Sequence, residues 1–220
     1  WNTPLAETRL DQFVDRERVE GETFDATLSG QIMDATSRYN LTNLANNRAQ
    51  DPSQLKVYRK LLENLRLDPA LAVRTAEAIA ASQEAAAAPQ GQDGQGGTGP
   101  VPGQSQPAPK GKGRPMALVT LDDLLSVPGY TPAIVDQQRE FVTLLPERAK
   151  LNVNTASAEV LAAVVGFSVG EGSALVARRK TAHFKDIADF QSAIPGREVD
   201  TTTYDVRSEF FLVASQVRLD

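Results

Sequence analysis

Residues 151–180 read Leu-Asn-Val-Asn-Thr-Ala-Ser-Ala-Glu-Val-Leu-Ala-Ala-Val-Val-Gly-Phe-Ser-Val-Gly-Glu-Gly-Ser-Ala-Leu-Val-Ala-Arg-Arg-Lys. Thr155 or Ser157 can supply the side-chain oxygen that caps the first turn of a helix, and Glu159 adds negative charge there. Apolar residues then recur with helical spacing and fall on one face: Val160, Leu161, Val164 and Val165. The stretch therefore begins with a short helix that buries one side.

The three glycines between Gly166 and Gly172 predict a break after this first helix. A second short helix is expected next, with its apolar residues at 174–176. Asp186 can cap a third helix, because Asp189 stands at the capping-box position. The inward-facing residues of the third helix are Ile187, Phe190 and Ile194. The sequence thus predicts a helix–hairpin–helix unit followed by one more helix.

The composition limits the class of protein. The chain has 220 residues, of which 41% are hydrophobic, enough for one large domain or two small ones. Its formal net charge of −5 argues against a general binder of nucleic acid or of anionic membranes. There is no cysteine, which excludes disulfides and thiol chemistry. No apolar run in this sequence approaches the roughly 18 residues typical of a membrane-spanning helix.

The first segment of the chain has a helical pattern. Residues 2–16 are expected to form an amphipathic helix, with Leu10, Phe13 and Val14 on one face and charged residues between them. This apolar face is narrow for an isolated helix, so we expect it to lean on another part of the protein.

Strand signals occur near both ends of the chain. In residues 22–34, apolar and polar residues alternate from Phe24 to Leu28, Ser29-Gly30 predicts a turn, and a second strand follows. Residues 203–219 return to strand, with a bend expected near Ser208. The alternating apolar residues of this last segment are Phe211, Val213, Val217 and Leu219.

Helix signals fill the middle of the chain. Asp51-Pro52 and Asp68-Pro69 each predict a helix start within residues 51–81, and residues 120–145 predict another helical pair. Residues 82–114 are low in complexity, rich in Gln, Ala, Gly and Pro, and are expected to form a flexible surface loop. Because an isolated hairpin is marginal in water, the two terminal strand segments are expected to share one sheet, covered by the first helix. The helical middle is then an insertion into that sheet domain.

Residue types needed for catalysis are scarce. His183 is the one histidine, so with no cysteine the sequence lacks the ligands of a usual zinc site. A Ser-His-Asp triad would need His183, which has no nucleophile motif near it. The glycines at 166–170 are not followed by the Gly-Lys-Ser/Thr of a phosphate loop. We therefore expect no catalytic, cofactor-binding or metal-binding residues and no enzymatic activity.

Several motifs occur together in a specific order. Gly30-Gln-Ile-Met-Asp34 runs into Arg38-Tyr-Asn-Leu-Thr-Asn-Leu44, and Leu144-Leu-Pro146 precedes Leu151-Asn-Val-Asn-Thr-Ala156. The last strand segment contains Phe210-Phe-Leu-Val-Ala-Ser215. In this order the motifs resemble those of the K-type minor pseudopilins of the bacterial type II secretion system, the general secretion pathway protein K family. The resemblance spans the chain except for its low-complexity segment.

The resemblance implies an α+β fold. It implies a type IV pilin-like domain, made of an N-terminal helix and an antiparallel sheet, with a large inserted α-helical domain that contains helix–hairpin–helix-like units. The expected division is residues 1–45 and 196–220 for the pilin-like domain and 46–195 for the insertion, with the flexible loop at 82–114. The resemblance also implies a hydrophobic helix before Trp1 that anchors the precursor in the inner membrane, with the rest of the protein in the periplasm.

The resemblance further implies a function in assembly. Family members help to form or cap the tip of the periplasmic pseudopilus together with I-type and J-type minor pseudopilins, and the H-type and the major pseudopilin are further candidate partners. The expected partner-binding residues are Trp1, Leu5, Leu10 and Phe13 on the helix at 2–16, although this stripe can equally pack on the chain's own sheet. Some family members bind calcium, but the acidic stretch that they often carry is not evident near residues 76–82.

An alternative hypothesis is a helix–hairpin–helix protein that binds nucleic acid. In such proteins the backbone amides of the hairpin contact phosphates, and Arg178, Arg179 and Lys180 could assist here. The acidic Glu171 within the expected hairpin and the negative net charge argue against it.

Overall fold

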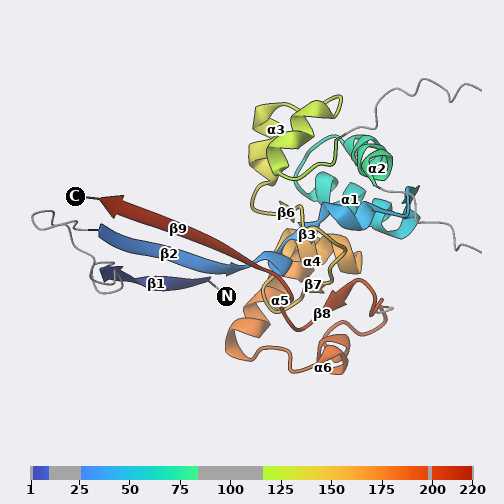
Figure 1. Cartoon of the computed structure of the whole chain (residues 1–220). Coiled ribbons are helices and arrows are strands. Elements are labelled where there is room, and N and C mark those ends of the chain that lie inside the picture. Colours follow the sequence, from blue (N-terminus) through green and yellow to red (C-terminus); the bar gives the residue numbers. More distant parts are fainter. Residues whose placement is uncertain (1, 10–25, 84–115, 198–199, 220) are drawn as a thin grey trace, which may run out of the picture.

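The fold consists of a small sheet attached to a larger helical body (Figure 1). The computed structural model describes residues 2–9, 26–83, 116–197 and 200–219. The sheet has three antiparallel strands in the order β1 (Asn2–Arg9), β2 (Ala26–Asp34) and β9 (Phe211–Leu219). Figure 1 shows the sheet projecting away from the body, which lies between β2 and β9 in the sequence. The prediction that the two terminal strand segments share one sheet is confirmed.

The predicted helix at residues 2–16 is wrong for residues 2–9, which form β1. This segment pairs with β2 from Asn2 opposite Met33 to Arg9 opposite Thr27. A proline disfavours the helical conformation in the residue before it, so Pro4 turns Thr3 toward an extended backbone. Pairing with a distant strand then outweighs a weak helical pattern. Residues 10–16 of the prediction lie outside the described residues.

The predicted turn at Ser29-Gly30 is also wrong, because β2 runs through it without interruption. Gly30 lies opposite Ser215 of β9. A Cβ atom at Gly30 would lie only 2.2 Å from the backbone oxygen of Ala214. The glycine therefore permits a close approach of two strands and does not reverse the chain.

The body consists of short helices joined by turns. Its α-helices are α1 (Pro52–Asn64), α2 (Leu71–Ser82), α3 (Pro132–Gln138), α4 (Ala158–Val165), α5 (Val169–Thr181) and α6 (Ile187–Ser192). The 3-10 helices η2 (Ala35–Ser37) and η3 (Leu41–Leu44) precede α1, and η4 (Leu121–Ser126) lies between α2 and α3. Three two-residue strand pairs complete the described body: β3 (Tyr39–Asn40) with β6 (Val142–Thr143), β4 (Ala45–Asn46) with β5 (Ala49–Gln50), and β7 (Leu151–Asn152) with β8 (Tyr204–Asp205).

Several predicted helix starts are confirmed by their capping bonds. Asp51 accepts hydrogen bonds from the amides of Ser53 and Gln54 at the start of α1, and Pro52 is the first helical residue. Asp186 caps α6, and Ser157, one of the two predicted candidates, caps α4. Local signals were sufficient here because a cap involves only neighbouring residues. The predicted low-complexity loop lies outside the described residues, apart from its first two.

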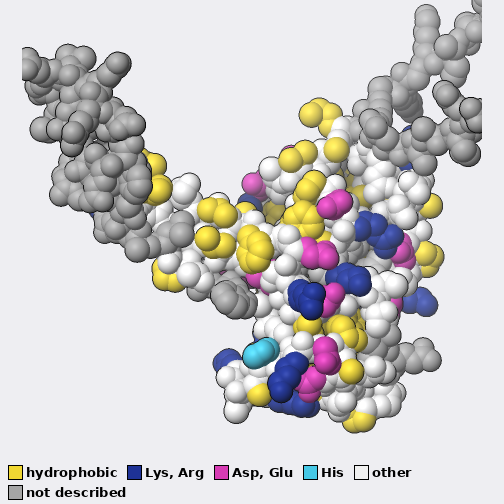
Figure 2. Space-filling model, turned by 60° about the horizontal axis from the view of Figure 1, so that its bottom comes forward, with side chains coloured by type: hydrophobic (Ala, Val, Ile, Leu, Met, Phe, Trp, Pro, Cys, Tyr) yellow, Lys and Arg dark blue, Asp and Glu magenta, His cyan; other side chains and the backbone are white. Residues whose placement is uncertain are grey.

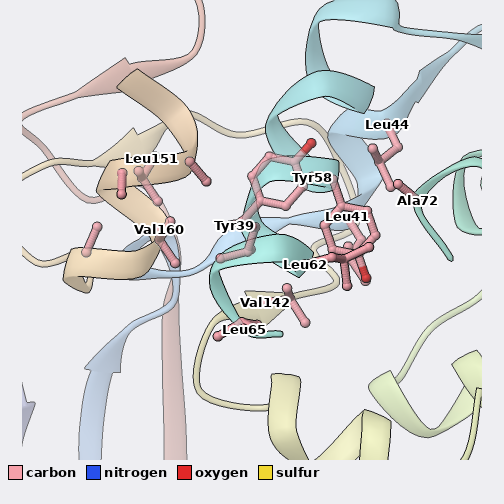
Figure 3. Close-up of a cluster of buried hydrophobic side chains, with 14 of the residues drawn as sticks. Tyr39, Leu41, Leu44, Tyr58, Leu62, Leu65, Ala72, Val142, Leu151 and Val160 are labelled. Atoms are coloured by element: carbon pink, nitrogen blue, oxygen red, sulfur yellow. The ribbon is translucent and has the colours of Figure 1, made fainter. Parts of the chain in front are cut away.

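The hydrophobic core lies within the body. Tyr39 and Tyr58 stack with their ring centroids 5.7 Å apart, and the Tyr58 hydroxyl donates to Gln138 Oε1 at 2.6 Å. Figure 3 shows these rings together with leucines and valines from several elements. No described residue of β1, β2 or β9 belongs to the buried apolar cluster. The body thus has its own core, and the described strands of the sheet have none.

Two helical hairpins in the body share one local design. Gly129, between η4 and α3, and Gly166, between α4 and α5, both have a positive φ, 96° and 80°. A buried aromatic residue follows each glycine, and a hydroxyl residue then caps the next helix. The corresponding pairs are Tyr130 and Phe167, then Thr131 and Ser168. The sequence carries the same recurrence, since Val127 precedes the turn at Gly129 and Val165 precedes Gly166.

The predicted break from Gly166 to Gly172 is too long. Helix α5 begins at Val169, so Gly170 and Gly172 lie inside it. Ser168 and Glu171 form a capping box that restarts the helix soon after the turn. Gly172 allows close helix packing, because a Cβ there would lie 2.4 Å from the backbone oxygen of Ala158 in α4.

Candidate assembly surface

The predicted partner-binding residues do not form a described helical stripe. Trp1, Leu10 and Phe13 lie outside the described residues. Leu5 lies in β1, where its backbone is opposite Gly30 of β2. Because residues 2–9 form a strand, a helix-borne stripe that begins at Leu5 is excluded. Among the described residues, the sheet itself offers a different candidate surface.

The register of β2 and β9 assigns their side chains to two faces. Residues directly opposite each other on antiparallel strands project to the same side of a sheet, and neighbours along a strand project to opposite sides. One side, called here the apolar face, carries Leu28, Ile32, Phe211, Val213 and Val217. The other, called the polar face, carries Thr27, Ser29, Gln31, Gln216 and Arg218, with Met33, Leu212 and Ala214.

The apolar face is exposed along β9 and half-buried at Leu28 and Ile32 of β2. Phe211, Val213 and Val217 keep 55%, 57% and 53% of their surface accessible. Figure 2 shows hydrophobic side chains on the sheet close to the body. Burying such side chains would contribute roughly 1.5–3 kcal/mol of favourable free energy each. An exposed apolar face therefore indicates an interaction surface. The sequence predicted these residues as the apolar side of the last strand, but their alternation with polar residues did not indicate that this side stays exposed.

The junction between sheet and body is organised around the buried carboxylate of Asp34, which is 2% exposed. Asp34 Oδ1 accepts hydrogen bonds from the Thr36 amide at 2.8 Å and the Thr36 hydroxyl at 2.6 Å. Asp34 Oδ2 accepts from Asn152 Nδ2 at 3.0 Å and from the Thr155 hydroxyl at 2.5 Å. Because Asp34 ends β2 and Asn152 belongs to the body, this cluster attaches the sheet to the body.

The protonation of Asp34 follows from these contacts. Burial by itself would raise the pKa of its carboxyl, but hydrogen bonds from Thr155, Thr36 and Ser208 outweigh that effect and lower the pKa. The group is therefore held as a carboxylate by neutral donors. This arrangement makes the junction a fixed structural contact.

The asparagines of the two central motifs bind backbone groups. Asn40 binds the amide of Leu145 and the carbonyl of Glu147, and Asn43 binds both backbone groups of Ala149. Asn154 binds both backbone groups of Phe184. Asn40 and Asn43 therefore have a structural role, because their side-chain amides hold neighbouring loops in place.

The start of α5 is occupied by its own side chains. Glu171 Oε2 accepts hydrogen bonds from the Ser168 amide and the Ser168 hydroxyl, each at 2.8 Å, and the amide bond lowers the pKa of Glu171. A phosphate bound at these amides would be repelled by the negatively charged carboxylate of Glu171. The capping box thus occupies the amides of Ser168 and Glu171, and the Glu171 carboxylate disfavours an anion at this helix start, which argues against the nucleic-acid alternative.

The two arginines proposed to help bind phosphate have other contacts. Arg178 lies 5.5 Å from the centroid of the Phe184 ring and 3.7 Å from an Asp189 oxygen. Arg179 is half-buried and donates to the carbonyl of Val153 at 2.7 Å. Burial lowers the pKa of Arg179. These side chains thus support the packing of α5.

The described residues also bear on metal binding and on membrane spanning. In that part of the chain, no three His, Cys, Asp or Glu side chains converge as they would around a metal ion. His183 is exposed. No single described helix has the length and apolar character to cross a membrane; α4 and α5 meet both criteria only as a pair bent by 117°.

Comparison with known proteins identifies the family. The models for type II secretion system protein K match residues 37–147, as its first part, and residues 151–207. The chain belongs to the type II secretion system protein K family. Its membership rests on the helical body, because both matched ranges exclude β1, β2 and β9.

A curated relative supports this membership. The chain is 29% identical over 221 residues to type II secretion system protein K of Pseudomonas aeruginosa, with 100% of the chain and 61% of the relative covered. The chain thus spans about three fifths of that relative. The predicted resemblance to this family of secretion pseudopilins is confirmed.

A solved structure supports the fold. The chain resembles one in the GspK-GspI-GspJ complex of the enterotoxigenic Escherichia coli type 2 secretion system, with a TM-score of 0.58 and 17% identity. The similarity covers 93% of this chain and 78% of the other. It shows a mixed α+β fold of the same kind.

Proposed function

We propose that this protein is a K-type minor pseudopilin that helps to form or cap the tip of the pseudopilus in type II secretion. It acts by assembly with other subunits and not by catalysis. Membership of the protein K family links the chain to the type II secretion system. The observation that carries the proposal is the exposed apolar face, because an apolar sheet face without a core of its own requires a partner layer.

The sheet fits a pilin-like module. We propose that β1, β2 and β9 form this module together with an N-terminal helix, and that the helical body between β2 and β9, which includes residues 46–195, is a domain inserted into it. The pairing of β2 with β9 on either side of the body in sequence supports this division. In the same proposal, a preceding helix anchors the protein in the inner membrane and the described residues lie in the periplasm.

The proposed partners are the I-type and J-type minor pseudopilins, with the H-type and the major pseudopilin as further candidates. The similar solved structure is described as a complex of GspK with GspI and GspJ, which supports this choice. Each partner subunit would contribute an apolar surface at the tip. Contact with that surface would exclude water from side chains of the apolar face such as Val213.

Co-purification tests the proposal. The chain is expressed with the I-type and J-type minor pseudopilins of the same bacterium, and a ternary complex is expected on size-exclusion chromatography. The double variant Val213→Glu, Val217→Glu places two charges on the apolar face and should reduce association at least about tenfold, because each buried charge is costly. Gln216→Glu, on the polar face of the same strand, is the matched control and should associate normally.

Two results would count against the proposal. If the wild-type chain forms no complex, assembly with these partners is wrong. If the double variant keeps the thermal stability and the affinity of the wild type, the apolar face is not the assembly surface. A secretion assay in a strain that lacks its own protein K provides the cellular readout. The double variant and Gln216→Glu should both keep the circular dichroism spectrum of the folded protein.

A further inference from the structure

The two edges of the sheet are built differently. In the described sheet, β1 and β9 are the outer strands. The β1 edge contains Pro4, has charged residues at Glu7 and Arg9, and shifts register between Leu5 and Thr8. Prolines, charges and bulges are the means by which proteins prevent an edge strand from pairing with another chain. The β1 edge is therefore protected.

The β9 edge lacks these features. Its nine residues, Phe211–Leu219, include no proline or glycine, and Arg218 is its one charged residue. Its register with β2 runs without a shift from Ala26 opposite Leu219 to Asp34 opposite Phe211. A long, regular and largely uncharged edge strand favours pairing with a further strand. Figure 1 shows β9 on the outer side of the described sheet.

The backbone groups that face outward follow from the ladder. The Ala35 amide donates to the Phe210 carbonyl at 2.9 Å, which places this pair at a hydrogen-bonded position just beyond the ladder of β2 and β9. In an antiparallel ladder, hydrogen-bonded pairs alternate with pairs whose backbone groups point away from each other. Counting from Ala35 and Phe210 along the unbroken register gives the two sets. Leu212, Ala214 and Gln216 turn their backbone groups toward β2, and Val213, Ser215 and Val217 turn theirs toward the outer edge.

We infer that the outer edge of β9 is a docking site for an extended strand of a neighbouring, different pilin-like subunit. The row of outward amides and carbonyls would bind the backbone of that strand, as in β-strand addition. Identifying the neighbour as pilin-like rests on the proposed function. The site differs from the apolar face, since it uses backbone groups in the plane of the sheet.

The charge of β9 favours pairing with a strand of a different subunit over pairing with a second copy of this chain. Arg218 forms no ion pair with another described residue, and β9 contains no carboxylate. Two copies of β9 paired with each other would therefore place no carboxylate from either strand beside Arg218. The expected partner strand places a carboxylate beside Arg218 on the polar face and apolar side chains beside Val213 and Val217 on the other.

Amide hydrogen exchange at residue resolution tests the inference directly. In the chain alone, the amides of Leu212, Ala214 and Gln216 should exchange slowly, and those of Val213, Ser215 and Val217 should exchange quickly. In complex with the I-type and J-type subunits, the second set should slow by at least about tenfold. If a complex forms and these three amides still exchange quickly, the edge inference is wrong and the proposed function stands. If no complex forms, both are wrong.

A backbone variant adds an independent test. Ser215→Pro removes one outward amide without removing a donor from the ladder with β2, and should weaken association by about tenfold. Ser215→Ala keeps the amide and is the matched control, with affinity unchanged. Equal affinities of the two variants, with both sheets folded, would overturn the inference. Protection of the outward amides that grows with the concentration of the chain alone would assign the edge to a second copy and overturn the choice of partner.

Discussion

The helical body and the sheet use apolar residues in opposite ways. In the body, Leu41, Leu61 and Leu161 are 0% exposed. On β9, Phe211 and Val213 keep more than half of their surface accessible, at 55% and 57%. Both regions therefore contain large apolar side chains, but only the body packs them against one another.

This difference separates stability from assembly. The body fills its own core and satisfies its loop backbones with asparagine side chains such as Asn40 and Asn43. The sheet presents one apolar face and one unprotected edge. Changes in the body should therefore lower the free energy of unfolding, and changes on the sheet should lower affinity for partners. The predictions below test this division from the largest expected effect to the smallest.

The largest effect is expected in the core of the body. Leu161→Ala should lower the free energy of unfolding by about 2–5 kcal/mol, because it leaves a cavity where Leu161 is fully buried. Urea denaturation followed by circular dichroism measures the change. Val213→Ala on the sheet is the control and should change stability by less than about 0.5 kcal/mol. Equal losses for both variants would remove the distinction between the two regions.

The junction should show a smaller effect. Asp34→Asn should cost about 1–3 kcal/mol, because its new amide meets the donors of Asn152 and Thr155. Asp136→Asn, at an exposed ion pair with Arg139, is the control and should cost less than about 1 kcal/mol. Thermal unfolding at neutral pH compares the two. A cost at Asp34 no larger than that at Asp136 would mean that the junction contributes little.

Asp34 also predicts a dependence on pH. Its pKa is lowered below the ordinary value of 3.8 in the folded protein, so the unfolded chain binds the proton more readily. The stability that Asp34 contributes is therefore complete above about pH 4 and is lost as the pH falls through the lower, folded pKa. Consequently, the stability difference between wild type and Asp34→Asn should shrink below pH 4. A difference that stays constant down to pH 2 would contradict this.

The hairpin should show an effect of about 1 kcal/mol. Ser168→Ala removes the side-chain oxygen that caps α5, and loss of a cap typically costs about 0.5–2 kcal/mol. The matched control is Ser173→Ala, since Ser173 lies within α5 and its hydroxyl binds only the carbonyl one turn earlier. Denaturation midpoints provide the comparison. A larger loss at Ser173 would show that the capping box is not what fixes the start of α5.

The smallest effect is expected from the low-complexity segment. Deletion of residues 85–112 should change stability by less than about 1 kcal/mol, because the entropy of closing a flexible loop grows slowly with its length. This prediction comes from composition alone. A loss of several kcal/mol in the shortened chain would show that the segment packs on the rest of the protein.

Local signals predicted the body well. The start of α1 at Asp51-Pro52 and the cap of α6 at Asp186 were both visible in the sequence. Each depends on contacts within a few residues, so periodicity and capping chemistry suffice. The burial of Leu161 followed from the same helical pattern.

Distant contacts were the source of the errors. Residues 2–9 form a strand because β2 pairs with them, and Gly30 admits β9 instead of turning the chain. The partners of Asp34 could not be foreseen either, since Asn152 is separated from it by 118 positions. Spacing along the sequence contains no direct information about such pairs.

The sequence by itself determined the order of the family motifs, the helix starts of the body and the alternation in the last strand. It could not determine whether another layer covers the apolar side of that strand, since alternation shows only that one side is apolar. The tertiary structure decided that Val213 and Val217 stay exposed and that the edges formed by β1 and β9 differ. The physical reason is that helix capping is local, whereas strand pairing and burial depend on residues far away in the sequence.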